Sequence, residues 1–192
     1  MPVTIGALTE SAPGEKRVSL VPEIAGKFAA TGARILMERG AGIRAQFPDA
    51  LYKNVEWADG ASVLAQSDIL LTVQPLTTAQ IAALKDGAVV IGFMQAHARV
   101  AEVKAFKERG LTSFAMEFVP RISRAQAMDV LSSQANLAGY KAVIDAAAQF
   151  GRAMPMMMTA AGTIAPARVF IMGVGVAGLQ AIATARRLGA IV

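Results

Sequence analysis

The chain of 192 residues is 54% hydrophobic and only 17% charged, so it has ample material for a folded core and is not a disordered segment. It contains no cysteine and a single histidine, His97, which excludes disulfides and cysteine metal sites and leaves little scope for a histidine-based one. We therefore expect no metal. The net charge of +5 is scattered without a block of like charges, so we expect no nucleic-acid partner.

Short apolar runs alternate with helical patterns through the first two thirds of the sequence. The expected elements are, in chain order, a strand at 3–8, a helix at 22–32, a strand at 33–40, a loop at 41–54, a strand at 67–75, a helix at 78–87 with Thr78 as its candidate cap, a strand at 88–95, a helix at 99–110 and a strand at 111–119. Several strands are near-continuous apolar runs, which is typical of strands covered by helices on both faces. The alternation predicts an α/β fold with a doubly wound, mostly parallel sheet.

The longest helical pattern, at 128–151, follows a polar segment after Pro120. Small residues recur along it at intervals of three and four, at Ser132, Ala135, Gly139, Ala142 and Ala146. One face of this helix is therefore built of small groups, on which another backbone can approach closely. Gly151 and Pro155 end the helix, and a second βα unit begins at Arg168.

This second βα unit contains three glycines with the spacing of a dinucleotide cradle, in the motif GVGVAG. Gly173 would allow a tight turn, Gly175 would let the backbone approach a pyrophosphate, and Gly178 would permit close packing of the helix. The helix that follows would direct its free N–H groups and the positive end of its dipole at the phosphates. The motif follows a strand pattern and opens a helix, which is the context that a cradle requires.

Two other interpretations of this stretch stay open on spacing alone: a short transmembrane segment over 169–185, and a glycine-rich turn without a ligand. The carboxylate that grips the adenosine ribose is expected about 20 residues after the motif, and the sequence ends at Val192, before that position. The final "GAIV" is typical of the start of another strand. We therefore expect a truncated domain with an exposed sheet edge and a tendency to self-associate.

These patterns predict two domains. Residues 1–122 form an N-terminal α/β domain of flavodoxin-like or Rossmann-like type. Residues 123–192 form the long helix and the truncated beginning of a Rossmann-type dinucleotide-binding domain.

The polar segment before the long helix is the second informative stretch. Ser123 and Gln126 have the spacing of a capping box for that helix, and Asp129 in its first turns suits the helix dipole. This account needs no ligand. It does not account for Arg121, nor for the position of Asp129 and Ser132 on one face beside it.

Three long motifs resemble a known family, and the resemblance runs over essentially the whole chain. They are "PGEKRVSLVPE", "PRISRAQAMDVLSSQANLAGYKAVIDAA" and "PMMMTAAGTIAPARVFIMGVGVAGLQAIATARRLGA". The family is the NAD(H)-binding component (domain I, the alpha subunit) of proton-translocating nicotinamide nucleotide transhydrogenase, a neighbour of the alanine dehydrogenases.

The resemblance implies direct hydride transfer from NADH, bound here, to NADP+ on a partner domain, coupled to proton translocation by a membrane-spanning subunit. It also implies a homodimer that is cytoplasmic, peripheral to the inner cell membrane and without a span of its own. Arg121, Asp129 and Ser132 would hold the nicotinamide or its ribose and amide, and Gln126 would align the partner's nucleotide. The residues that match the pyrophosphate turn are Gly173, Val174, Gly175, Val176, Ala177 and Gly178.

Two alternatives stay open. An alanine dehydrogenase-like activity needs a group that shuttles protons and cations that clamp a carboxylate. That relative has a lysine and a histidine where this sequence offers Thr72 or Gln74, and Gln95; Arg17 is retained, and His97 is expected at the surface. Hydride transfer between two nicotinamides needs alignment only, so these residues favour the transhydrogenase. The other alternative is a folded binding or dimerisation module with negligible nucleotide affinity.

Overall fold

A computed structural model describes residues 2–192 and divides the chain into two compact units, Met1–Val119 and Pro120–Val192. We name them unit 1 and unit 2. The predicted assignment of the two domains, with its boundary at residue 122, stays a prediction.

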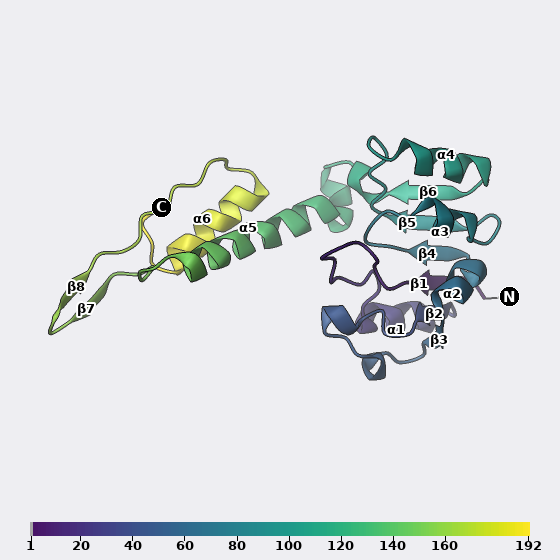
Figure 1. Ribbon diagram of the computed structural model, residues 1–192, viewed down its shortest axis with the longest axis horizontal. Coiled ribbons are helices and arrows are strands. Elements are labelled where there is room, and N and C mark those ends of the chain that lie inside the picture. The colour runs from purple at the N-terminus through teal and green to yellow at the C-terminus, as the bar shows by residue number, and fades with distance from the viewer. Residues whose placement is uncertain (1) are drawn as a thin grey trace. The chain divides into compact units, whose positions relative to one another are not determined.

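Unit 1 is built on a sheet of six parallel strands in the order β3-β2-β1-β4-β5-β6, which Figure 1 shows side by side. The strands are β1 (Thr4–Ala7), β2 (Arg34–Glu38), β3 (Glu56–Ala58), β4 (Ile69–Leu71), β5 (Val89–Gly92) and β6 (Thr112–Ala115). Ile5 of β1 pairs with Ile35 on one side and Ile69 on the other. The chain thus moves outward from β1 in one direction, returns to β4, and moves outward in the other. This confirms the predicted doubly wound α/β fold.

Helices of unit 1 connect these strands. They are α1 (Pro22–Ala30), α2 (Gly60–Gln66), α3 (Thr78–Ala82) and α4 (Val100–Glu108), with short 3-10 helices at Ile43–Ala45, Asp49–Leu51 and Met116–Phe118. Ile35 and Met37 of β2 join Ala25 of α1 in one hydrophobic cluster, whereas Leu36 joins Val63 of α2 in another. Successive side chains of a strand point to opposite faces, so the sheet carries a core on each face.

The sequence interpretation missed β3 and α2, which both lie between residues 55 and 66. β3 has three residues, and its register with β2 pairs Leu36 with Glu56. α2 has seven residues and follows the N-cap Asp59, whose side chain accepts the N–H of Ser62. Elements this short show no measurable periodicity, and pairing with β2 rather than composition makes the strand.

The predicted cap of α3 at Thr78 is wrong by one position. Thr77 is the N-cap, and it forms a capping box with Gln80. The Thr77 hydroxyl accepts the N–H of Gln80, and the Gln80 side chain accepts the N–H of Thr77.

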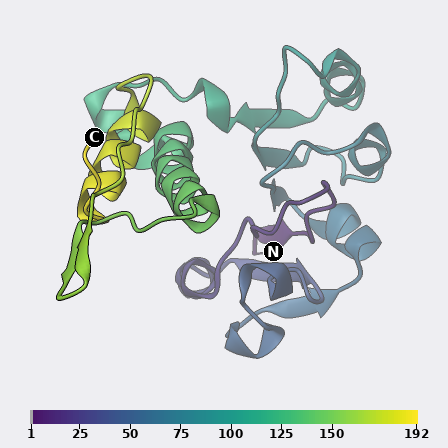
Figure 2. The ribbon, with the colours of Figure 1, turned by 60° about the vertical axis from the view of Figure 1, so that its left-hand side comes forward.

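Unit 2 is built on two helices, α5 (Val130–Gln149) and α6 (Val176–Arg187), which lie side by side in both views (Figure 1, Figure 2). A Cβ placed on Gly139 of α5 would lie 2.1 Å from the carbonyl oxygen of Ala177 in α6. The small-residue face predicted for the long helix therefore does receive another backbone. The core of unit 2 forms around Val143, Ala181 and Ala185.

The segment expected as a strand at the start of the second βα unit forms only one bridge, between Arg168 and Ile191. The N–H of Val169 donates to the carbonyl of Ile191, and the N–H of Ile191 donates to the carbonyl of Ala167, both at 2.8 Å. The terminal "GAIV" thus does pair in parallel with that segment, as a strand start would.

Two further features of unit 2 differ from the expectations. A hairpin of β7 (Met157–Thr159) and β8 (Gly162–Ile164) was not expected, and every residue of both strands is exposed. The capping box predicted at Ser123 and Gln126 is wrong, because Ser123–Met128 forms a 3-10 helix and the N-cap of α5 is Asp129. None of the helices found in residues 2–192 is both long enough and apolar enough to span a membrane.

Candidate functional site

The glycine motif forms a tight turn from which α6 starts. Gly173 has a φ of +98°, a left-handed value that favours glycine. A Cβ on Gly178 would lie 2.0 Å from the Gly173 carbonyl oxygen, so the helix can start this close to the turn only with glycine there. Gly175 is the N-cap of α6, and a Cβ on it would meet nothing within 4 Å. The open space in front of Gly175 leaves the N-terminus of α6 accessible.

Asp129 fixes the side chain of Ser132 at the start of α5. One carboxylate oxygen accepts the backbone N–H of Ser132 at 2.9 Å, and the other accepts its hydroxyl at 2.6 Å. These bonds, first from the hydroxyl and then from the N–H, lower the pKa of Asp129, and the charge of Arg121 adds a smaller effect. The carboxylate is therefore ionised near neutral pH. Because the Ser132 hydroxyl donates its hydrogen to Asp129, the lone pairs of the Ser132 oxygen are free to accept another hydrogen bond.

A pocket of about 490 Å³ is lined both by the region around the start of α5 and by the glycine turn. Every residue that lines it belongs to unit 2. The lining residues are Arg121, Leu131, Ser132, Ala135, Met172, Gly173, Gly175, Val176, Ala177 and Gly178. Its volume lies within the range of small-molecule and cofactor sites. The structure thus brings the polar loop and the glycine turn, more than forty residues apart in sequence, onto one hollow.

Packing of α5 on α6 explains why these stretches meet. Gly139 contacts the backbone of Ala177, and Ser132 and Ala135 occupy the same small-residue face of α5, nearer its N-terminus. The contact at Gly139 therefore holds the N-terminus of α6 against the first turns of α5. Larger residues at these positions would separate the two helices and widen the pocket.

Some of the expected site residues do not line this pocket. Asp129 acts on it only through Ser132, while Gln126 is exposed and Val174 is 71% exposed. Conversely, Leu131 and Met172 line the pocket without having been expected. Neither side chain carries a chemical signal in the sequence, and only the fold reveals their position.

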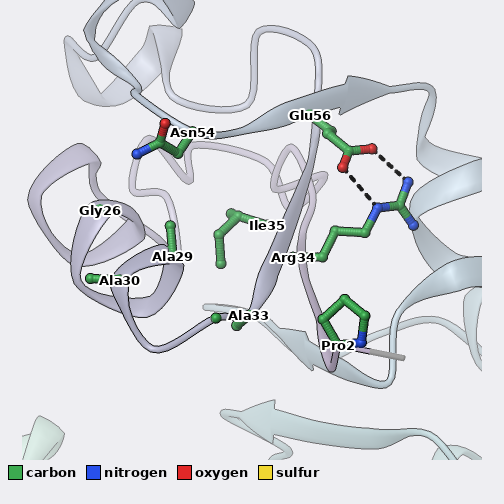
Figure 3. Close-up of a pocket in the computed structure, with 10 residues that line it drawn as sticks. Pro2, Gly26, Ala29, Ala30, Ala33, Arg34, Ile35, Asn54 and Glu56 are labelled. Atoms are coloured by element: carbon green, nitrogen blue, oxygen red, sulfur yellow. Dashed lines mark hydrogen bonds and ion pairs between the residues drawn. The ribbon is translucent and has the colours of Figure 1, made fainter.

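A second hollow lies in unit 1, at the amino ends of the strands, between α1 and the start of β2 (Figure 3). It measures about 440 Å³, and Gly26, Ala29 and Ala30 form its helical wall. Its one guanidinium, on Arg34, is paired with Glu56 at 2.7 Å. Ligands of doubly wound sheets bind at the other end, beyond the carboxyl ends of the strands, so this hollow is not a candidate catalytic site.

The carboxyl ends of β1 and β4 form the switch point of unit 1, where the direction of strand addition reverses. Glu10 is 8% exposed, and its carboxylate accepts the N–H groups of Val73 at 2.6 Å and Gln74 at 3.0 Å. Glu15 accepts the Gln74 side-chain amide at 2.7 Å and pairs with Arg17 at 2.6 Å. We name Glu10, Glu15, Arg17 and Gln74 the switch-point cluster.

The positions at which an alanine dehydrogenase-like chemistry was considered carry no acid or base. Thr72 is buried, and Gln74 is bound to both glutamates of the switch-point cluster. Gln95 has a left-handed φ of +48°, and its N–H donates to Glu117 at 2.6 Å. His97 is exposed, as expected, with its ring 5.3 Å from that of Phe118.

Known proteins resemble this chain over both units. The family model "Alanine dehydrogenase/PNT, N-terminal domain" matches residues 6–138, and "Alanine dehydrogenase/PNT, C-terminal domain" matches residues 142–192. A protein of Rhodospirillum rubrum, named as the first of the parts that make up the alpha subunit of NAD(P) transhydrogenase, is 50% identical, in an alignment covering 95% of this chain and 50% of the relative.

Solved structures give the same result. The crystal structure of transhydrogenase from Sinorhizobium meliloti matches with a TM-score of 0.94 and 48% identity, over 97% of this chain and 57% of that one. An L-alanine dehydrogenase matches with a TM-score of 0.85 and 23% identity, over 98% of this chain and 53% of that one, and so shares the fold. The chain spans about half the length of these relatives. It belongs to the alanine dehydrogenase/PNT family, and within that family it is similar to the alpha subunit of NAD(P) transhydrogenase.

Proposed function

We propose that this chain is the NAD(H)-binding part of a proton-translocating transhydrogenase. In the assembled enzyme, hydride would pass directly from NADH on unit 2 to NADP+ on a partner domain, and a membrane-spanning subunit would couple this transfer to proton movement. The single observation that carries the proposal is the pocket that Arg121 and Ser132 share with Gly173, Gly175 and Gly178. The identity to a transhydrogenase alpha subunit supports it.

The glycine turn suits a pyrophosphate. The N–H groups at the start of α6 have no partners within the helix, and the positive end of the helix dipole adds to their attraction for an anion. Gly175 leaves room for the phosphates to approach the backbone closely. Residues 173–178 would therefore hold the pyrophosphate, with Val174, Val176 and Ala177 contributing through the backbone.

The polar loop suits the nicotinamide end of the nucleotide. Ser132, with its proton directed to Asp129, can accept a hydrogen bond from a ribose hydroxyl or a carboxamide N–H. Arg121 can donate to a carboxamide or phosphate oxygen. The bound nicotinamide supplies the hydride, and these residues would supply alignment, which is what a direct transfer requires.

The partners follow from the relatives. Because the Rhodospirillum rubrum relative is named as one portion of an alpha subunit, its enzyme has further chains, and we assign to such chains the NADP(H) site and the membrane span. Gln126, exposed at the polar loop, would contact the partner's nucleotide. We further propose a homodimer located in the cytoplasm, peripheral to the inner cell membrane.

Two measurements test this function. NADH fluorescence should change saturably when the nucleotide is titrated into this chain, and absence of saturation would favour the binding-module alternative. In the complete enzyme with its partner domain, NADH should reduce an NADP+ analogue, whereas turnover of alanine with NAD+ would show the alanine dehydrogenase alternative to be right.

The Arg121→Ala variant refines the test. Arg121 is exposed and makes no structural bond to another side chain among those found in the described residues, so we expect its loss to slow hydride transfer at least about tenfold with little change in unfolding temperature. If the unfolding temperature and the hydride-transfer rate both fell markedly, the role of Arg121 would be structural.

A further inference from the structure

Glu10 lies at the place where doubly wound sheets bind their ligands. In open parallel sheets, ligands occupy the region beyond the carboxyl ends of the strands at the switch point, which here lies between β1 and β4. Val73 and Gln74 lie just after β4, beyond Thr72, and both of their N–H groups donate to a single carboxylate. That carboxylate belongs to the loop after β1, at position 10.

The contacts of Glu10 are those of a bound anion. Each of its two oxygens accepts one N–H from consecutive residues, and the residue is 8% exposed. Charge-assisted bonds from two backbone N–H groups are one way in which proteins bind carboxylates. Burial is the main cause that raises the pKa of Glu10, and the two N–H groups act against that rise; the charge of Glu15 adds to the rise, and the charge of Arg17 opposes it. The position is therefore a carboxylate site built from backbone donors.

The other residues of the switch-point cluster also form hydrogen bonds with one another. Glu15 is 9% exposed and accepts bonds from both Arg17 and the Gln74 amide. The donors identified at this place, from the main chain and from side chains, thus have acceptors within the loop that follows β1. An anionic substrate that reached the switch point would have to displace a carboxylate of the protein itself.

We propose that Glu10 is an internal ligand: its side chain occupies a monocarboxylate-binding position formed by the N–H groups of Val73 and Gln74, and a free monocarboxylate takes that position when the side chain is removed. In unit 1, a side chain of the protein then occupies the place at which other doubly wound sheets bind an acidic ligand. This inference is independent of the nucleotide function proposed for unit 2.

Chemical rescue of the Glu10→Ala variant tests the proposal. The substitution removes an acetate-sized fragment and leaves two buried N–H groups without an acceptor, so the variant should unfold at a lower temperature than the wild type. Acetate at up to about 0.5 M, compared with chloride at equal ionic strength, should raise its Tm saturably by several degrees through binding to the folded state. Butyrate, which is too large for the space, should not.

Three controls separate binding from general salt effects. The wild type, Glu10→Gln and Glu23→Ala should respond to acetate no more than to chloride, because the first two keep the site filled and Glu23 is an exposed partner of Lys27. Equal responses in all four proteins, or a Glu10→Ala variant as stable as the wild type, would overturn the proposal. If Glu10→Ala is unfolded in chloride, recovery of its helical circular dichroism in acetate supports the proposal, and failure to recover counts against it.

Discussion

Asp129 sets the direction of the Ser132 side chain in the pocket. It binds the N–H and the hydroxyl of Ser132 together, so the same carboxylate starts α5 and sets which way the Ser132 proton points. One side chain thus both caps α5 and orients the Ser132 hydroxyl.

Asp129→Asn separates these two tasks. Asparagine is also a good N-cap, so we expect little change in unfolding temperature. Its amide N–H2 can donate to Ser132, which would turn the hydroxyl proton toward the pocket and remove the free lone pair. The dissociation constant for NADH should then rise about tenfold, the equivalent of one lost hydrogen bond. Paired fluorescence titration and thermal unfolding measure both effects, and unchanged affinity would contradict this role of Asp129.

Glu15 makes the stability of unit 1 depend on acid pH. Hydrogen bonds from Arg17 are the first cause that lowers the pKa of Glu15 from 4.5 to about 2, and the amide of Gln74 adds to them. Since the folded state has the lower pKa, this stabilisation is present in full above pH 4.5 and is lost as the pH falls toward 2.

Glu15→Gln should remove that pH-dependent stabilisation. The Arg17 side chain is 41% exposed, so solvent screening reduces the effect, and we expect a loss of about 2 kcal/mol in the free energy of unfolding at pH 7. The difference from the wild type should shrink as the pH is lowered toward 2. Urea unfolding at several pH values measures it, and a difference that does not vary with pH would rule out this cause.

Among the elements, α5 and α6 depend on one close approach. Gly139 admits the backbone of Ala177, and this contact also sets the width of the pocket. The stability of unit 2 and the shape of its candidate site therefore have a common origin.

The Gly139→Ala variant tests whether this close contact sets both the stability of unit 2 and the shape of the pocket. Its Cβ would lie 2.1 Å from a backbone oxygen, so the helices must separate, at a cost of about 2 kcal/mol in the free energy of unfolding. NADH affinity should fall as well. Gly26→Ala in α1 is the matched control, because its Cβ meets nothing within 4 Å and alanine favours a helix by up to about 1 kcal/mol. Equal stability changes for the two variants would refute the argument.

How far sequence predicted these elements depends on their length. The long helix and the GVGVAG turn were predictable, because small-residue periodicity and glycine spacing are local properties of the chain. The hairpin β7–β8 and strand β3 were not, since strands of three residues owe their existence to a pairing partner. The 3-10 helix at Ser123–Met128 displaced the expected cap for a similar reason, as Ala125 is buried at 4% exposure and so ties that turn to its surroundings.

For the molecule as a whole, the candidate site belongs to unit 2 alone. Two hydrophobic clusters form the core of unit 1, and one smaller cluster around Val143 forms that of unit 2. Sequence singled out Arg121, Ser132 and the glycines, and the structure places them around one pocket, whereas their chemical roles stay a prediction. Sequence could not predict that Asp129 contacts Ser132 rather than the pocket itself. That direction follows from the position of Asp129 as the N-cap of α5, which only the fold reveals.

The hairpin β7–β8 has a consequence for the chemistry of the protein under oxidative conditions. Met156, Met157 and Met158 are 57%, 50% and 72% exposed, whereas Met37 in the core of unit 1 is fully covered. Peroxide reaches exposed thioethers first and converts them to polar sulfoxides. A two-stranded hairpin is marginal on its own, so three added sulfoxide dipoles would change this arm of unit 2 long before either core is affected.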